Sequence, residues 1–212
     1  MSDTDLKYDG TVIDMISDTL NTLKMHSGGG VTINHPKWSG LTKEQIISMI
    51  ETGGVIAIEI YNASCELSNN TGYALDIWDA ILSEGVQVYG VAVPDHEAQY
   101  RPAENRQPFG YNHVLVVNET EDEILSAYRI GHFYTTLLND RLTLSNVNLS
   151  NTGLYSIEVS EASTFTFTTA TRSVTISEVS TSAGFQTEEG DIYVRTEVVR
   201  GNNKLWTNAI ML

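Results

Sequence analysis

The pattern of apolar and polar positions along the chain changes close to residue 139. Before it, stretches with apolar residues at helical spacing alternate with short apolar runs. After it, apolar residues alternate or cluster at strand spacing, and helix signals are absent. Strands that alternate with helices indicate a mainly parallel sheet, whereas short strands separated by regular turns indicate a β-sandwich. We therefore expect an α/β domain in residues 1–138 and an all-β domain in residues 139–212.

The first part contains four helix signals. Thr42 can cap a helix, Gln45 can bond back to it, and Leu41 can pack on Ile46, which together predict a helix start. Thr120 and Glu123 resemble a second capping box. Further helices are expected from the helical spacing of Val12, Ile16, Leu20 and Leu23 and over residues 73–83.

Five apolar runs in the first part predict strands, at residues 31–33, 55–61, 86–93, 113–117 and 133–137. The fold class expected is α/β, with a partial (β/α) barrel-like parallel sheet followed by a small all-β sandwich. Five strands are fewer than the eight of a closed barrel. We expect Val31–Ile33 to be an open edge that residues 1–27, a partner chain or a second copy covers.

The composition restricts the partners. With 27 acidic and 12 basic residues, the net charge is −15, which disfavours bulk nucleic acid and anionic membranes as partners. The single cysteine, Cys65, excludes an intramolecular disulfide. The polar, acidic N-terminus does not resemble a secretory signal, and no apolar stretch is long enough to span a bilayer. A cytoplasmic or virion- or assembly-associated protein is expected.

Two groups of possible metal ligands directly follow predicted strands. His35 follows the strand that ends at Ile33, and Asp95, His96 and Glu97 follow the strand that ends at Val93. Since parallel strands end at one edge of a sheet, these side chains are expected to converge as ligands of a hydrolytic metal ion. Each segment alone is better explained as a polar loop with a capping or ion-pairing aspartate, and only their combination favours a site.

Other polar residues stand out by their surroundings. Glu59 interrupts an apolar strand, so its carboxylate must be paired, hydrogen-bonded or functional. His113 opens a predicted strand and is expected to be structural. His26 and His132 lie at predicted helix ends, where a cation suits the helix dipole. Cys65 has no evident base beside it, which favours an unreactive surface or packing thiol.

Several short motifs occur in an order that resembles the PHP (polymerase and histidinol phosphatase) superfamily. The motifs are Gly30-Val-Thr-Ile-Asn-His35-Pro, Ile58-Glu-Ile-Tyr-Asn62, Tyr89-Gly-Val-Ala-Val-Pro-Asp-His96 and Gly131-His-Phe-Tyr-Thr135. The resemblance implies a distorted β/α barrel, a cluster of two or three Zn, Mn or Fe ions, and phosphoester hydrolysis. It matches His35 and Asp95 to ligand positions of the family.

The sequence also departs from the family pattern. The family has a histidine two residues after the aspartate, whereas this chain has Glu97 there and His96 one place early. The opening His-x-His strand of the family has no counterpart before Gly28, as though the chain began within such a domain. We therefore expect one weakly bound divalent metal (Zn, Mn or Fe) at low occupancy. The ligands expected are His35, Asp95, His96 and Glu97, with Asn34, Glu59, Asn62 and His113 as further site candidates.

Three functions compete at this point. The first is a metal-dependent phosphoesterase-like protein that has an incomplete metal site and little or no activity alone, and that acts on a phosphoester substrate. The second is a non-catalytic structural or binding module, for example of a phage or surface assembly, that retains the scaffold. The third is a carbohydrate-binding protein, which the β-rich second half alone suggests.

Overall fold

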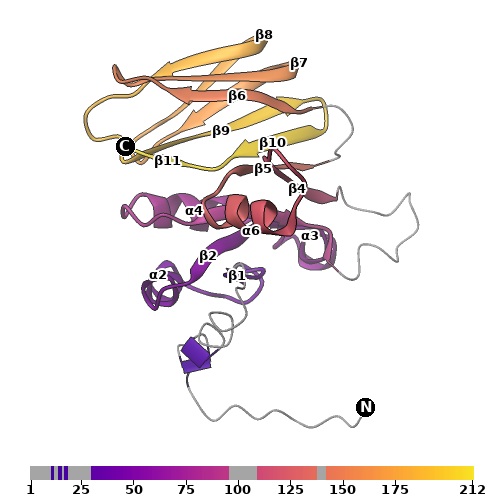
Figure 1. The fold of residues 1–212 in the computed structure, drawn as a ribbon, viewed down its shortest axis with the longest axis vertical. Coiled ribbons are helices and arrows are strands. Elements are labelled where there is room, and N and C mark those ends of the chain that lie inside the picture. Colours follow the sequence, from indigo (N-terminus) through magenta and orange to yellow (C-terminus); the bar gives the residue numbers. More distant parts are fainter. Residues whose placement is uncertain (1–10, 12–13, 16, 19–29, 96–108, 138–141) are drawn as a thin grey trace.

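The computed structural model describes residues 11, 14–15, 17–18, 30–95, 109–137 and 142–212 (Figure 1). Its strands form two sheets. Sheet A has three parallel strands in the order β1-β2-β3, and sheet B has eight strands that pair in antiparallel fashion. In Figure 1 the curled sheet B lies above the helices and sheet A.

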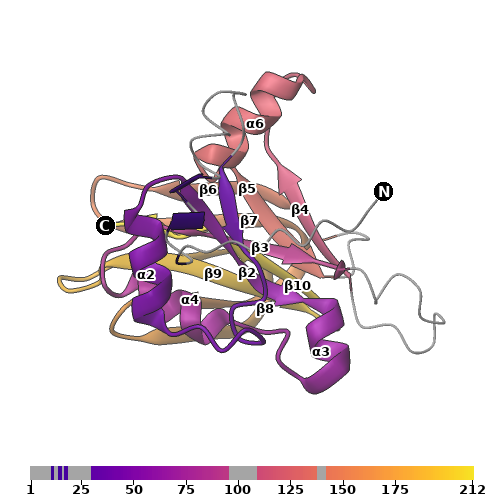
Figure 2. The ribbon, with the colours of Figure 1, turned by 90° about the horizontal axis from the view of Figure 1, so that it is seen from below.

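Sheet A consists of β1 (Val31–Ile33), β2 (Val55–Asn62) and β3 (Tyr89–Val93). The helices between these strands are α2 (Lys43–Glu51), α3 (Ala63–Asn69) and α4 (Leu75–Leu82). Figure 2 shows α2 and α4 on one side of the sheet and α6 on the other. Ile46 of α2 and Trp78 of α4 are fully buried against Ile58 and Ile60 of β2 in the largest core. Parallel pairing was therefore predicted correctly for these three strands.

Sheet B combines strands from both ends of the chain. Its order is β4-β5-β10-β9-β7-β6, with β8 paired to β7 and β11 paired to β9. The helix α6 (Glu121–Arg129) connects the first two strands. The strands are β4 (Gly110–Val114), β5 (Phe133–Leu137), β6 (Leu144–Leu149), β7 (Leu154–Thr168), β8 (Ser173–Gln186), β9 (Tyr193–Arg200), β10 (Asn203–Thr207) and β11 (Ile210–Met211).

The expected fold class, a partial (β/α) barrel followed by a separate sandwich, is wrong. The protein is mostly β, because β4 and β5 leave the parallel sheet and pair in antiparallel fashion with each other. The strand Phe133–Leu137 was predicted and is buried on both faces, but its neighbours are β4 and β10, both antiparallel, rather than another parallel strand. Tyr134 faces the core of sheet B, whereas Leu137 belongs to the core that covers sheet A.

The pairing of β5 with β10 crosses the position where we expected two domains to meet. The core around Trp78 also contains Tyr193 and Trp206 from the second half. In addition, Arg195 of β9 binds Asp79 of α4 through two hydrogen bonds of 2.6 Å each. The division into two folding units, residues 1–138 and 139–212, stays a prediction. If it holds, the two units share a core, a pair of adjacent strands and an ion pair.

Two asparagines replace a fourth strand at the outer edge of β3. The Asn112 amide accepts from the Ala92 N–H at 3.0 Å and donates to the Ala92 carbonyl at 2.9 Å. Asn208 accepts from the Gly90 N–H at 2.9 Å and donates to the Gly131 and Phe133 carbonyls. A buried backbone group without a partner is costly, so these amides allow sheet A to end after three strands.

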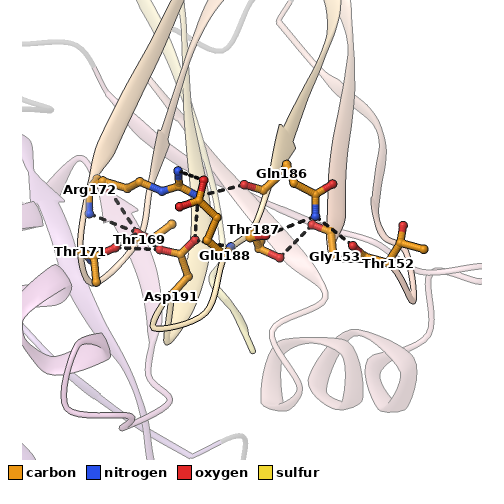
Figure 3. A network of polar contacts seen from close by, with 9 residues as sticks. All are labelled: Thr152, Gly153, Thr169, Thr171, Arg172, Gln186, Thr187, Glu188 and Asp191. Carbon is orange, nitrogen blue, oxygen red and sulfur yellow. Dashed lines mark hydrogen bonds and ion pairs between the residues drawn. The ribbon is translucent and has the colours of Figure 1, made fainter.

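A polar network closes one end of sheet B (Figure 3). The Asp191 carboxylate accepts hydrogen bonds from Thr169, Thr171, the Arg172 guanidinium and the Glu188 N–H, at 2.7 to 3.0 Å. Burial by itself raises the pKa of this carboxyl, but the hydrogen bonds outweigh it and lower the pKa to about 2. The network ties the turn after β7 to the turn after β8.

The helix starts follow the predicted capping chemistry in part. Thr42 and Gln45 form the complete reciprocal capping box at the start of α2. At α6, Thr120 accepts from the Glu123 N–H at 3.3 Å. However, the Glu123 carboxylate binds Asn118 instead of returning to Thr120, so the second half of that predicted box is wrong.

Candidate functional site

A chain of hydrogen bonds joins the carboxyl ends of the three strands of sheet A. Glu59 Oε2 accepts from the His35 N–H at 2.7 Å and from Asn62 Nδ2 at 2.9 Å. The same Asn62 nitrogen donates to Asp95 Oδ2 at 2.8 Å. Four residues singled out in the sequence, one after β1, two in β2 and one after β3, are therefore directly linked.

Asn62 holds this group together and is itself fixed. Its side chain is 1% exposed, and its Oδ1 accepts from the Cys65 N–H at 2.9 Å as the N-cap of α3. This bond decides which end of the amide faces α3, so the NH₂ group must point at the two carboxylates. The sequence analysis did not predict the helix α3, which contains Cys65. The signal that predicts it is an asparagine after a strand and before Ala63-Ser64-Cys65, which is typical of an N-cap.

The backbone is strained on both sides of the network. His35 and Asp95 have φ values of 32° and 56°, and they are two of the three non-glycine residues with positive φ in the described parts of the chain. Left-handed conformations are costly for residues with a Cβ and concentrate at functional sites. Here the His35 N–H bond to Glu59 and the Asp95 bond to Asn62 hold the two residues in place.

Glu59 is a buried carboxyl, with 6% of its surface exposed. Burial raises its pKa, the hydrogen bonds from Asn62 and the His35 N–H act against this, and the nearby Asp95 charge raises it further; the net shift is upward. A buried carboxylate with a second carboxylate nearby is the environment in which a cation gains most. The electrostatics therefore favour positive charge at this end of sheet A.

Tyr128 of α6 contacts the same face of the sheet, and the sequence did not single it out. Its hydroxyl lies 2.8 Å from Thr32 Oγ1. Burial raises the pKa of Tyr128, the Thr32 hydrogen bond lowers it, and the Glu59 charge raises it further, with a net upward shift. A neutral phenol is therefore bonded to Thr32 of β1 and feels the charge of Glu59. No sequence signal indicates this, because the position of α6 depends on the pairing of β5 in sheet B.

The His35 ring lies at the rim of the site. Its Nδ1 is 3.0 Å from Ser39 Oγ, and the ring meets that of Trp38 edge-on at a centroid distance of 5.0 Å. Trp38 is 55% exposed. An aromatic side chain is therefore accessible from solvent beside the network.

The remaining candidates lie elsewhere or outside the described residues. Asn34 is exposed after β1. His113 belongs to sheet B, where its Nε2 lies 2.8 Å from Thr136 Oγ1 and its ring stacks on Tyr134 at 4.6 Å. Burial lowers the pKa of His113, which suits the structural role expected for it. His96 and Glu97 lie outside the described residues.

The described site offers few side chains that could bind a metal ion. In the described parts of the chain, no three His, Cys, Asp or Glu side chains gather closely enough to hold a metal ion. Glu59 and Asp95 are carboxylates of the kind that bind divalent ions, but the Asn62 NH₂ group occupies one oxygen of each. The described residues alone therefore do not fit a cluster of two or three metal ions.

Comparisons with known proteins found no similar sequence or structure. No protein-family model, curated protein or solved structure matches the chain. Within the described residues, no helix is long and apolar enough to cross a bilayer.

Proposed function

We propose that the chain is a metal-dependent phosphoesterase-like protein whose single divalent-metal site lies at the carboxyl ends of β1, β2 and β3. The observation that carries the proposal is the Asn62 amide between the carboxylates of Glu59 and Asp95. The carboxylates of Glu59 and Asp95, at the ends of neighbouring strands, share only the partial positive charge of the Asn62 NH₂ group. A cation would neutralise their negative charge more completely. The resemblance to the PHP superfamily gives the reaction class.

A divalent ion at this position would be held by few protein ligands. Glu59 and Asp95 supply carboxylate oxygens, and the ring of His35 lies at the rim. His96 and Glu97 directly follow Asp95 in the sequence and would complete the set. A hydrolytic metal needs about three protein ligands and one open position for water. One ion can meet this requirement, which is why weak binding and slow turnover by this chain alone are expected.

The metal would also make an anionic substrate acceptable. A chain with a net charge of −15 repels phosphoesters, and the two site carboxylates repel them most at close range. A bound divalent ion reverses the local sign of the charge and can polarise a phosphoryl oxygen. Substrate binding should therefore depend strictly on metal.

One observation favours the second candidate, a non-catalytic structural or binding module. The Asn62 amide already satisfies one oxygen of each carboxylate, and α3 is capped by the same side chain. A site that is complete in this way needs no metal ion to be stable. Under this alternative, the protein neither binds divalent ions at Asp95 nor hydrolyses phosphoesters.

The test is calorimetric titration of the chelator-treated protein with Mn²⁺ and Zn²⁺, combined with hydrolysis of p-nitrophenyl phosphate. We expect one ion per chain and slow, metal-dependent turnover. Asp95→Asn should weaken metal binding at least tenfold, about 1.4 kcal/mol, and remove the turnover. The matched control is Asp122→Asn on the exposed start of α6, which should change neither. Equal metal binding by both variants would contradict the proposal.

A further inference from the structure

A second possible binding site lies away from the carboxylate network. A cavity of about 640 Å³ opens between the turn that joins α6 to β5, the first residues of β6 and the link between β10 and β11. Cavities of a few hundred to about 1,000 Å³ are the usual size for small-molecule sites. Tyr89 forms part of the wall and packs so closely on Gly131 that a Cβ there would lie 2.2 Å from the ring.

The wall of this cavity is divided into apolar and polar parts. Leu115, Ile130 and Ile210 contribute aliphatic surface. Gln87, Ser145, Asn146 and Thr207 bring amides and hydroxyls to the same space. A ligand that fits both parts carries an apolar surface and several hydrogen-bonding groups at once.

Charge restricts the ligand further. None of the sixteen described residues that line the cavity is Asp, Glu, Lys or Arg. His132 is the one described lining residue that can carry a charge, and that charge is positive. A cationic ligand would therefore lose its hydration without gaining a counter-charge, and the net charge of −15 opposes anions. The lining therefore favours a neutral molecule.

One polar group in the wall has no hydrogen-bond partner among the described residues. Gln87 Nε2 is buried and makes no hydrogen bond to any described residue. Asn208, by contrast, uses its whole amide to bind Gly90, Gly131 and Phe133, so it stabilises the fold. Buried polar groups in native proteins nearly always have a partner, and Gln87 Nε2 can bind a ligand oxygen once the Gln87 side chain turns toward the cavity, because the nitrogen has almost no accessible surface in its present position.

We propose that this cavity binds a neutral saccharide of one or two rings. A sugar ring combines apolar C–H surface with a rim of hydroxyl groups and carries no charge, which matches a divided wall that has no Asp, Glu, Lys or Arg among its described residues. The ring rests on the aliphatic surface around Ile130 and Ile210, and its hydroxyls reach Ser145 and Asn146 directly and Gln87 after that side chain turns toward the cavity. The site is separate from the Glu59–Asn62–Asp95 network and does not depend on metal.

Calorimetric titration of the full chain with a saccharide panel tests this proposal. The panel contains glucose, galactose, mannose, N-acetylglucosamine, maltose, cellobiose and lactose, with glucuronic acid and glucosamine as charged probes and the dye ANS as an apolar probe. We expect at least one neutral sugar to bind with a Kd below about 10 mM, and the charged sugars to bind at least tenfold more weakly.

Two variants locate the binding. Ser145→Trp fills the cavity from β6 and should weaken sugar binding at least tenfold, whereas Ser182→Trp, on an exposed position of β8, should leave it unchanged. Gln87→Leu keeps the approximate size of the side chain and should weaken the sugar about tenfold while leaving the fold intact, since it breaks no hydrogen bond to a described residue. The proposal is overturned if no sugar binds, if only ANS binds, or if Ser145→Trp and Ser182→Trp behave alike.

Discussion

The side-chain nitrogen of Asn62 lies 2.8 Å from Asp95 Oδ2, so a residue at the end of β2 holds a carboxylate that follows β3. The two residues are 33 positions apart in the sequence, and parallel pairing of the strands brings them together. Glu59 completes the arrangement on the other side of the amide. The proposed metal site and several testable consequences follow from this contact.

Removal of the Asn62 side chain should destabilise the protein. Asn62→Ala deletes the N-cap of α3, and it removes the donor that the buried Glu59 shares with the half-buried Asp95. The cap contributes about 1 kcal/mol and an unsatisfied buried group costs about 1–3 kcal/mol, so we expect a loss of about 2–3 kcal/mol of unfolding free energy. Urea denaturation measures it. Asn34→Ala, at an exposed position, is the control and should stay within about 0.5 kcal/mol of the wild type.

Glu59 should make stability and metal affinity respond to pH in opposite directions. Its pKa is raised in the folded protein, so the folded state binds the proton more tightly than the unfolded state. Stability should therefore be greatest below the unfolded pKa and fall as the pH rises through the folded pKa. Metal binding requires the ionised form and should strengthen over the same range. Glu59→Gln should remove this part of the stability change, as measured by thermal unfolding from pH 4 to 8. An unchanged pH profile would contradict the assignment.

Asp191 should respond to acid in the opposite sense. The folded pKa of about 2 lies below the ordinary value of 3.8, so the stabilisation is present above pH 3.8 and disappears as the pH falls towards 2. Asp191→Asn should cost about 2 kcal/mol at neutral pH, because it weakens charge-assisted hydrogen bonds such as the one from Arg172 (Figure 3). Glu189→Gln in the same turn is exposed and is the matched control for urea unfolding. Equal losses in the two variants would show that the network adds no stability.

The ion pair between Arg195 and Asp79 should couple the two halves of the chain. Arg195 is 4% exposed, and Tyr193 also donates to Asp79 at 2.9 Å. Arg195→Met removes the charge but keeps much of the aliphatic volume. Because the Asp79 side chain is 27% exposed, we expect a loss of about 2–3 kcal/mol of unfolding free energy, below the 3–5 kcal/mol typical of a fully buried pair.

Chemical denaturation should show a single transition in the wild type; two transitions would support independent domains at the predicted boundary.

The sequence contained enough information for the local parts of the site but not for the sheet around it. A glutamate inside an apolar strand and polar residues after strands 31–33 and 86–93 are visible in a single sequence, because burial and strand ends leave local patterns. The same holds for the capping box at Thr42. Asn62 was visible as a candidate, but its role as the cap of α3 was not recognised.

The pairing of β5 with β10 could not be predicted in this way. Phe133–Leu137 carries apolar residues on both faces beside Thr135 and Thr136, which is equally consistent with a parallel strand and with a strand between two cores. Its true partner, Asn203–Thr207, lies far along the chain, and no local pattern specifies that pairing. The hydrogen bonds from Asn112 and Asn208 to β3 could not be predicted for the same reason. An asparagine can replace a neighbouring strand only after the tertiary structure has placed it beside the sheet edge.

The central claim is that a divalent ion binds to the carboxylates of Glu59 and Asp95, next to the Asn62 amide, and paramagnetic broadening by Mn²⁺ tests it most directly. In ¹⁵N-correlated NMR spectra at substoichiometric Mn²⁺, the side-chain NH₂ of Asn62 and the backbone N–H groups of His35 and Cys65 should broaden first. Asp95→Asn should abolish this selective broadening. Broadening that begins instead at the exposed acidic start of α6, or that spreads evenly over the surface, would contradict the account.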